Sequence, residues 1–102
     1  MRVGLIGLGT VGSGVVEIFS RHAEDFRQRA GVDIALSRFA DRDPRREAEL
    51  GLPAGSFTTD AFDLINDPEI DIIIELIGGT GVARDVVLAA LESGKSVVTA
   101  NK

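Results

Sequence analysis

Three glycines near the start of the chain have the spacing of a loop that holds a phosphate. Gly7, Gly9 and Gly12 form a GxGxxG motif directly after a short apolar stretch, residues 3–6. In such a loop the first glycine permits a tight turn, the second lets backbone N–H groups approach a pyrophosphate, and the third lets a helix pack closely against the strand. The phosphates then lie at the positive end of that helix. The alternative is a glycine-rich turn that holds no ligand.

A second candidate group is the carboxylate of Asp41, which follows Gly12 by 29 residues. The usual separation is ~20 residues, and a long helix after the loop accounts for the difference. A carboxylate here can accept hydrogen bonds from the ribose hydroxyls of NAD and would repel the 2′-phosphate of NADP. Arg42, Arg45 and Arg46 lie close by, and a guanidinium could hold that phosphate. The balance leans slightly to NAD over NADP. The other interpretation is that Asp41 only begins a turn.

Alternating strands and helices are expected to position these groups. The apolar pattern predicts strands at residues 3–6, 32–40, 71–77 and 96–100, with a short additional strand within 52–59. It predicts helices from the glycine loop to residue 29, and at 43–51, 61–66 and 80–94, where Thr80 is the expected cap of the last helix. Such alternation implies right-handed crossovers between parallel strands. We therefore expect a Rossmann-type, doubly wound α/β fold with a mainly parallel sheet of about five strands and helices on both faces.

In such a sheet the ligand binds beyond the carboxyl ends of the strands, where the strand order reverses. Four of the predicted strand exits carry glycine, charged or amide groups: the glycine loop, Asp41 to Asp43, Gly78 with Gly79 and Thr80, and Asn101 with Lys102. We expect them to form one continuous site. Glu75 interrupts an apolar strand, and it either shapes this site or is satisfied by the backbone. His22, the only histidine, is expected on the surface of the first helix, away from the strand exits.

Composition limits the class of protein. The 102 residues allow at most one domain, and 44% apolar content with 12 glycines suits a compact α/β domain. The net charge of −5 with scattered basic residues argues against a nucleic-acid partner. No apolar run approaches the ~20 residues of a membrane span. The absence of cysteine excludes disulfides and thiolate-bound metals and fits a cytoplasmic protein. No metal ligands are expected.

Three segments, in their order along the chain, resemble the amino-terminal NAD(P)-binding domain of the homoserine dehydrogenases. They are GLGTVGSG at residues 7–14, IDIIIELIGG at residues 70–79 and GKSVVTANK at residues 94–102. The resemblance implies an oxidoreductase that interconverts aspartate 4-semialdehyde and homoserine with a nicotinamide dinucleotide. This reaction would belong to the threonine and methionine branch of amino-acid biosynthesis.

The resemblance also implies roles for individual residues. Thr10 and Val11 match loop residues whose backbone holds the pyrophosphate, and residues 78–80 match a segment that passes near the nicotinamide. Lys102 matches a lysine at the junction of cofactor and substrate, with roles in binding and in proton transfer. A lysine there can supply positive charge or, with a lowered pKa, act as acid or base. Its other interpretation is a mobile charged terminus.

The substrate-binding and dimerisation region of the family, with its metal site, is expected beyond residue 102. Residues 1–102 are therefore expected to form one truncated NAD(P)-binding domain, inactive alone and able to self-associate through exposed apolar surface. Another NAD(P)-dependent oxidoreductase or a nucleotide-sensing regulatory module remains an alternative, as does a methyltransferase-like binder of S-adenosylmethionine. The third glycine and the immediate helix favour a dinucleotide over the last alternative.

Overall fold

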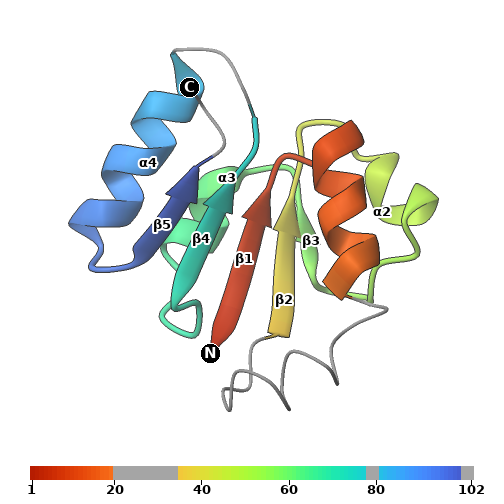
Figure 1. The fold of residues 1–102 in the computed structure, drawn as a ribbon, viewed down its shortest axis with the longest axis horizontal. Helices are drawn as coiled ribbons and strands as arrows, with labels where there is room; N and C mark the ends of the chain where they lie inside the picture. Colours follow the sequence, from red (N-terminus) through yellow and green to blue (C-terminus); the bar gives the residue numbers. More distant parts are fainter. Residues whose placement is uncertain (20–34, 78–80, 100–102) are drawn as a thin grey trace.

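Five parallel strands form one sheet in the order β3-β2-β1-β4-β5 (Figure 1). They belong to a computed structural model of the protein that describes residues 1–19, 35–77 and 81–99. The strands are β1 (Arg2–Ile6), β2 (Ala35–Ala40), β3 (Phe57–Thr58), β4 (Ile72–Glu75) and β5 (Ser96–Thr99). Residues 10–19 are helical, and the further helices are α2 (Arg46–Glu49), α3 (Ala61–Ile65) and α4 (Val82–Glu92). The predicted Rossmann-type α/β fold is confirmed.

The strand order reverses between β1 and β4. From the central β1 the chain builds β2 and β3 on one side, then crosses to build β4 and β5 on the other (Figure 1). The last residues of the five strands pair with one another in register: Thr58, Ala40, Ile6, Glu75 and Thr99. All five strands therefore end at one level, and the exits of β1 and β4 adjoin at the point where such sheets bind ligands.

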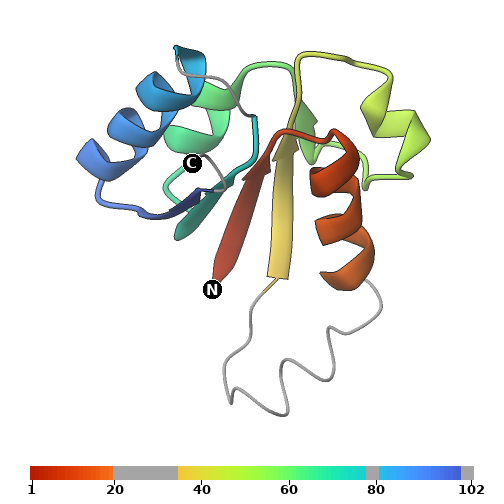
Figure 2. The same cartoon turned by 45° about the horizontal axis from the view of Figure 1, so that its top comes forward.

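Helices cover both faces of the sheet, as Figure 2 shows. On one face α3 and α4 pack against a buried cluster that includes Ile6, Ile73 and Val86. On the other face the helix at residues 10–19 and the segment around α2 cover a second cluster built on Leu5 and Phe39. Successive strand residues such as Leu5 and Ile6 thus serve opposite layers, because side chains alternate across a strand. Among the described residues, every helix is too short or too polar to span a lipid bilayer.

Two boundaries of the expected helices are confirmed, the start of the helix expected at 61–66 and the close of the helix expected at 80–94. Asp60 caps α3, since its Oδ1 accepts a hydrogen bond from the backbone N–H of Phe62 at 3.0 Å. Gly94 ends α4 in the left-handed region with φ +83. Its N–H donates to the carbonyl of Leu91, and the N–H of Lys95 donates to that of Ala90. These two bonds satisfy carbonyls that the last helical turn leaves free.

Two expected helix starts are wrong. α2 begins at Arg46, not at Asp43-Pro44. Two successive turns precede it, each closed by a hydrogen bond from a backbone N–H to an aspartate carboxylate. Asp41 accepts from the N–H of Asp43 at 2.8 Å, and Asp43 accepts from the N–H of Arg45 at 3.0 Å. The N-cap of α4 is Gly81 rather than Thr80 and provides no side-chain hydrogen bond. Thr80 itself, His22 and residues 32–34 of the second predicted strand lie outside the described residues.

Candidate functional site

The glycine loop leaves β1 in the conformation that its motif predicts. Gly7 has φ +99, and a Cβ there would lie 2.9 Å from the backbone carbon of Leu76. A Cβ on Gly12 would overlap the carbonyl oxygen of Gly7, so the helix that starts at residue 10 lies against the loop. A Cβ on Gly9 would meet no atom within 4 Å. Gly7 and Gly12 are therefore required by the fold, whereas Gly9 leaves open space.

Backbone hydrogen bonds and one buried side chain fix the position of the glycine loop. The N–H of Gly7 donates to the carbonyl of Ala40 at 2.8 Å, which ties the exit of β1 to that of β2. Leu8, within the loop, is fully buried and packs against Leu5 and Phe39. The N–H of Ser13 donates to the carbonyl of Gly9 at 2.8 Å. Helix geometry then leaves the N–H groups of residues 10–12 without helical partners, as binding of an anion requires.

Asp41 joins the glycine loop to the end of β2. Its Oδ2 accepts a hydrogen bond from the N–H of Leu8 at 2.7 Å, and its Oδ1 accepts from the N–H of Asp43 at 2.8 Å. Asp41 begins a turn, as the second interpretation of this residue expected. Its hydrogen bond from Leu8 also fixes the position of the glycine loop. A carboxylate has about four acceptor positions, so these two bonds leave capacity for ribose hydroxyls.

The three arginines after Asp41 differ in what their guanidinium groups contact. Arg45 makes two hydrogen bonds to the carboxylate of Asp43, at 3.0 and 2.9 Å. This side-chain bond is the main reason that the pKa of Asp43 falls to about 2. Arg46 pairs with Glu49 at 3.5 Å. Among the described residues, Arg42 has neither an ion pair nor a side-chain hydrogen bond, which leaves it available to a ligand.

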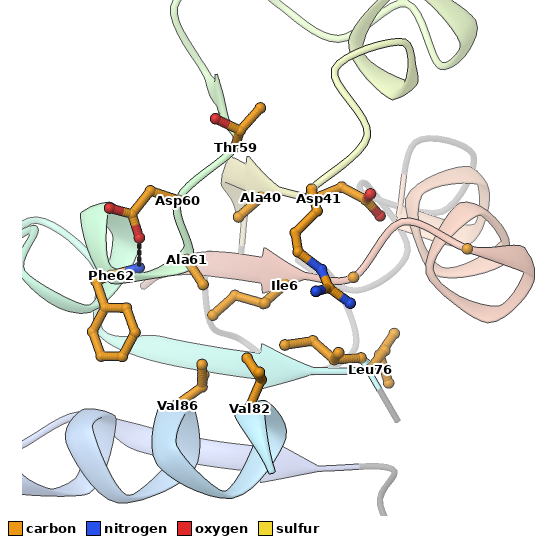
Figure 3. A pocket seen from close by; sticks show the side chains of 14 residues that line it. Ile6, Ala40, Asp41, Thr59, Asp60, Ala61, Phe62, Leu76, Val82 and Val86 are labelled. Carbon is orange, nitrogen blue, oxygen red and sulfur yellow. Dashed lines mark hydrogen bonds between the residues drawn. The ribbon is translucent and has the colours of Figure 1, made fainter. Parts of the chain in front are cut away.

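A cavity of about 410 Å³ lies beyond the carboxyl ends of β1, β2 and β4 (Figure 3). Its volume is in the range of small-ligand sites. Its wall also includes the exit of β3 and the starts of α3 and α4, and most of the wall is apolar. The lining residues are Ile6, Gly7, Gly9, Ala40, Asp41, Arg42, Thr59, Asp60, Ala61, Phe62, Leu76, Ile77, Val82 and Val86.

The structure brings together part of the predicted site. Four predicted residues line the cavity: Gly7, Gly9, Asp41 and Arg42. The other three described ones, Thr10, Val11 and Gly12, lie at the start of the helix, just beyond the lining. The remaining predicted residues lie outside the described ranges, namely Gly78, Gly79, Thr80, Asn101 and Lys102.

Sequence reasoning missed two parts of this site. The exit of β3 supplies Thr59 and the start of α3 supplies Phe62 to the cavity, although β3 has only two residues and gives a weak apolar signal. Val82 and Val86 of α4 form the opposite wall (Figure 3). The signal that could have found the first part was Asp60, a helix cap placed just after a strand. The second depends on how α4 packs on the sheet.

Glu75 accepts one hydrogen bond from the backbone and one from a side chain. Its side chain is fully buried at the end of β4. Oε2 accepts a hydrogen bond from the backbone N–H of Ile77 at 2.6 Å, and Oε1 accepts one from Oγ1 of Thr99 at 2.6 Å. The carboxylate is thus satisfied in part by the backbone, and it also joins two neighbouring strand exits.

The chain is similar to homoserine dehydrogenases over its whole length. A family profile described as "Homoserine dehydrogenase, NAD binding domain" matches residues 7–102. The homoserine dehydrogenase of Methylobacillus glycogenes is 48% identical over 102 residues, which cover all of this chain and 25% of that protein. The crystal structure of a homoserine dehydrogenase from Thiobacillus denitrificans superposes with a TM-score of 0.90 at 48% identity, over 99% of this chain and 23% of that one.

A more distant structural neighbour shares the fold. A levoglucosan dehydrogenase solved with NADH and levoglucosan superposes with a TM-score of 0.78 at 22% identity, over 97% of this chain and 26% of that one. At this identity the likeness shows the fold alone. The chain spans about a quarter of the length of the relatives it matches.

Proposed function

The chain belongs to the homoserine dehydrogenase family, whose NAD-binding domain it matches, and we propose that its described cavity binds a nicotinamide dinucleotide. In the whole enzyme this domain would serve the interconversion of homoserine and aspartate 4-semialdehyde. The observation that carries the proposal is the glycine loop. Gly7 and Gly12 allow no side chain, while Gly9 faces open space beside the cavity.

The described residues fit three parts of such a cofactor: the pyrophosphate, a ribose and an aromatic base. The free N–H groups at the start of the helix, at Thr10 and Val11, suit the pyrophosphate. Asp41 has spare acceptor positions for ribose hydroxyls, and the apolar wall around Ala40 and Phe62 suits a flat aromatic base. When bound, the cofactor supplies the group that gives or takes a hydride. The chain's own residues bind and orient it.

We propose that NAD binds more tightly than NADP. Asp41 carries a negative charge at the end of β2, and this charge would repel a 2′-phosphate. Arg42 opposes that effect, because it lines the cavity and its guanidinium has no partner among the described residues. Arg42 therefore sets how much NADP the site accepts, whereas Arg45 is already paired with Asp43.

Calorimetric titration of the chain with NAD and, separately, NADP tests both statements. Saturable binding of NAD, tighter than that of NADP, is the expected result. Arg42→Ala should weaken NADP about tenfold or more, the scale of a lost charged hydrogen bond, and should change the affinity for NAD less than about twofold. Arg45→Ala is the matched control and should leave both affinities unchanged.

Each outcome has a distinct meaning. Tighter binding of NADP, lost on Arg42→Ala, would reverse the preference but keep the dinucleotide site. Equal effects of Arg42→Ala and Arg45→Ala would show that general positive charge, not Arg42, attracts the phosphate. Failure of the wild-type chain to bind either dinucleotide would refute the proposed site in residues 1–102.

We further propose that residues 1–102 alone do not oxidise homoserine. About three quarters of the length of the matched relatives lies outside the aligned region, and a homoserine pocket is expected there. By the family resemblance, Lys102 would act at the junction of cofactor and substrate, and Asn101 and residues 78–80 would line the nicotinamide side. Formation of NADH or NADPH from homoserine by the purified chain would refute the proposed inactivity.

A further inference from the structure

Glu75 is a buried carboxylate at the carboxyl edge of the sheet, one strand away from the glycine loop. Its side chain is fully buried at the end of β4, and both oxygens accept hydrogen bonds of 2.6 Å. Burial of a carboxylate is unfavourable unless hydrogen bonds compensate it. An apolar side chain of similar size would fill this space without that cost. The position therefore points to a role that an apolar residue could not fill.

The two hydrogen-bond partners of Glu75 belong to different strand exits. Ile77 lies two residues beyond β4 and lines the cavity beside Leu76. Thr99 ends β5 and pairs in register with Glu75. The carboxylate thus fixes the direction in which the chain leaves β4 and ties it to the end of the neighbouring strand. Glu75 is not itself part of the lining, so it acts on the cavity through its bond to Ile77, which is.

On the basis of the dinucleotide site proposed above, we propose that Glu75 is a positioning residue for the nicotinamide half of the cofactor. Each half of a doubly wound sheet binds one mononucleotide. Asp41, at the end of β2, lies in the adenosine half, so β4 and β5 belong to the other half. Loss of the carboxylate would release the cavity wall at Ile77, whereas the N–H of Leu76 would still donate to the carbonyl of Ile6. The glycine loop and Asp41 would still hold the rest of the ligand.

The test compares the binding of NAD with that of ADP-ribose, which lacks only the nicotinamide. Glu75→Ala should weaken NAD about tenfold, the scale expected when a charged hydrogen-bonding group is removed, and should change ADP-ribose less than about twofold. Glu75→Gln should restore NAD binding to within about threefold, because an amide can accept from the N–H of Ile77 and donate to Oγ1 of Thr99. Calorimetry measures both affinities, and circular dichroism checks the fold.

A matched control separates positioning from loss of stability. Ser56 is also buried, and its hydroxyl donates to the carbonyl of Pro53 at 2.6 Å, just before β3. Ser56→Ala removes a buried hydrogen bond next to β3, at the opposite edge of the sheet from β4 and β5. It should leave the ratio of the two dissociation constants unchanged.

The outcomes distinguish this inference from the proposed function. Equal weakening of NAD and ADP-ribose by Glu75→Ala, or no weakening of either, would overturn the positioning role and leave the dinucleotide site intact. If the wild-type chain binds neither ligand, the proposed function fails and this role fails with it. If Glu75→Ala does not fold, Thr99→Val decides. It removes one of the two bonds and should raise the dissociation constant of NAD about threefold, with ADP-ribose unchanged.

Discussion

Replacement of Gly12 by alanine is expected to lower the free energy of unfolding by about 2 kcal/mol. The new Cβ would overlap the carbonyl oxygen of Gly7 and would lie 2.9 Å from its carbon. A backbone carbonyl cannot rotate away as a side chain can, so the cost lies at the upper end of the ~1–3 kcal/mol typical of overpacking. The greater helix propensity of alanine returns up to ~1 kcal/mol.

Two other glycines of the same segment are matched controls for this substitution. A Cβ on Gly9 or on Gly14 would meet no atom within 4 Å, and neither residue has a positive φ. Gly14→Ala lies in the helix and should stabilise the chain by up to ~1 kcal/mol. Gly9→Ala should leave stability nearly unchanged. It should weaken NAD binding about tenfold or more, because the methyl group would occupy space beside the cavity that the pyrophosphate needs.

Thermal and urea unfolding of the three variants, with calorimetric titration of NAD, check these expectations. A loss of about 2 kcal/mol corresponds to a melting temperature about 8–16 °C lower for a domain of this size. Gly12→Ala with wild-type stability would refute the close contact between helix and loop. Gly9→Ala with unchanged NAD affinity would refute the placement of the pyrophosphate at this loop.

Two further predictions concern acid stability and the core. Because Asp43 has a pKa lowered to about 2 by its bond to Arg45, its pairing should stabilise the fold fully above about pH 4 and lose that contribution as the pH falls to about 2. An NMR titration of the carboxyl carbon checks this. Arg45→Ala should move the midpoint back toward the ordinary value of 3.8, and a wild-type midpoint near 4 would contradict the pairing. Ile73→Ala, at a fully buried position, should cost about 3 kcal/mol in urea unfolding. Leu88→Ala, at a residue that is 47% exposed, should change stability by less than about 0.5 kcal/mol, and equal costs would refute the assigned core.

The outcome for Asp41 shows what a local pattern can and cannot supply. Its place after a predicted strand was enough to mark it as a candidate, because strand ends in a parallel sheet meet at one edge. Its hydrogen bond to the N–H of Leu8 joins positions 33 residues apart. No periodicity relates the two, since the contact depends on β1 and β2 being neighbours in the sheet. The sequence does not predict that α2 starts as late as Arg46, because an aspartate such as Asp43 can either cap a helix or close a turn. In the fold, its hydrogen bonds with Arg45 close a turn.

The alternation of strands and helices, the glycine loop and the family can all be read from the order of the residues. These features depend on short-range constraints, namely the steric freedom of glycine, the periods of apolar residues and the order of motifs. The contribution of Thr59, after β3, and of Phe62, in α3, to the cavity depends instead on the packed fold. The packed fold also decides that Glu75 meets Thr99, which lies in register on the neighbouring strand. Both results depend on which strands become neighbours, and strand order arises from packing of the whole sheet rather than from any single segment.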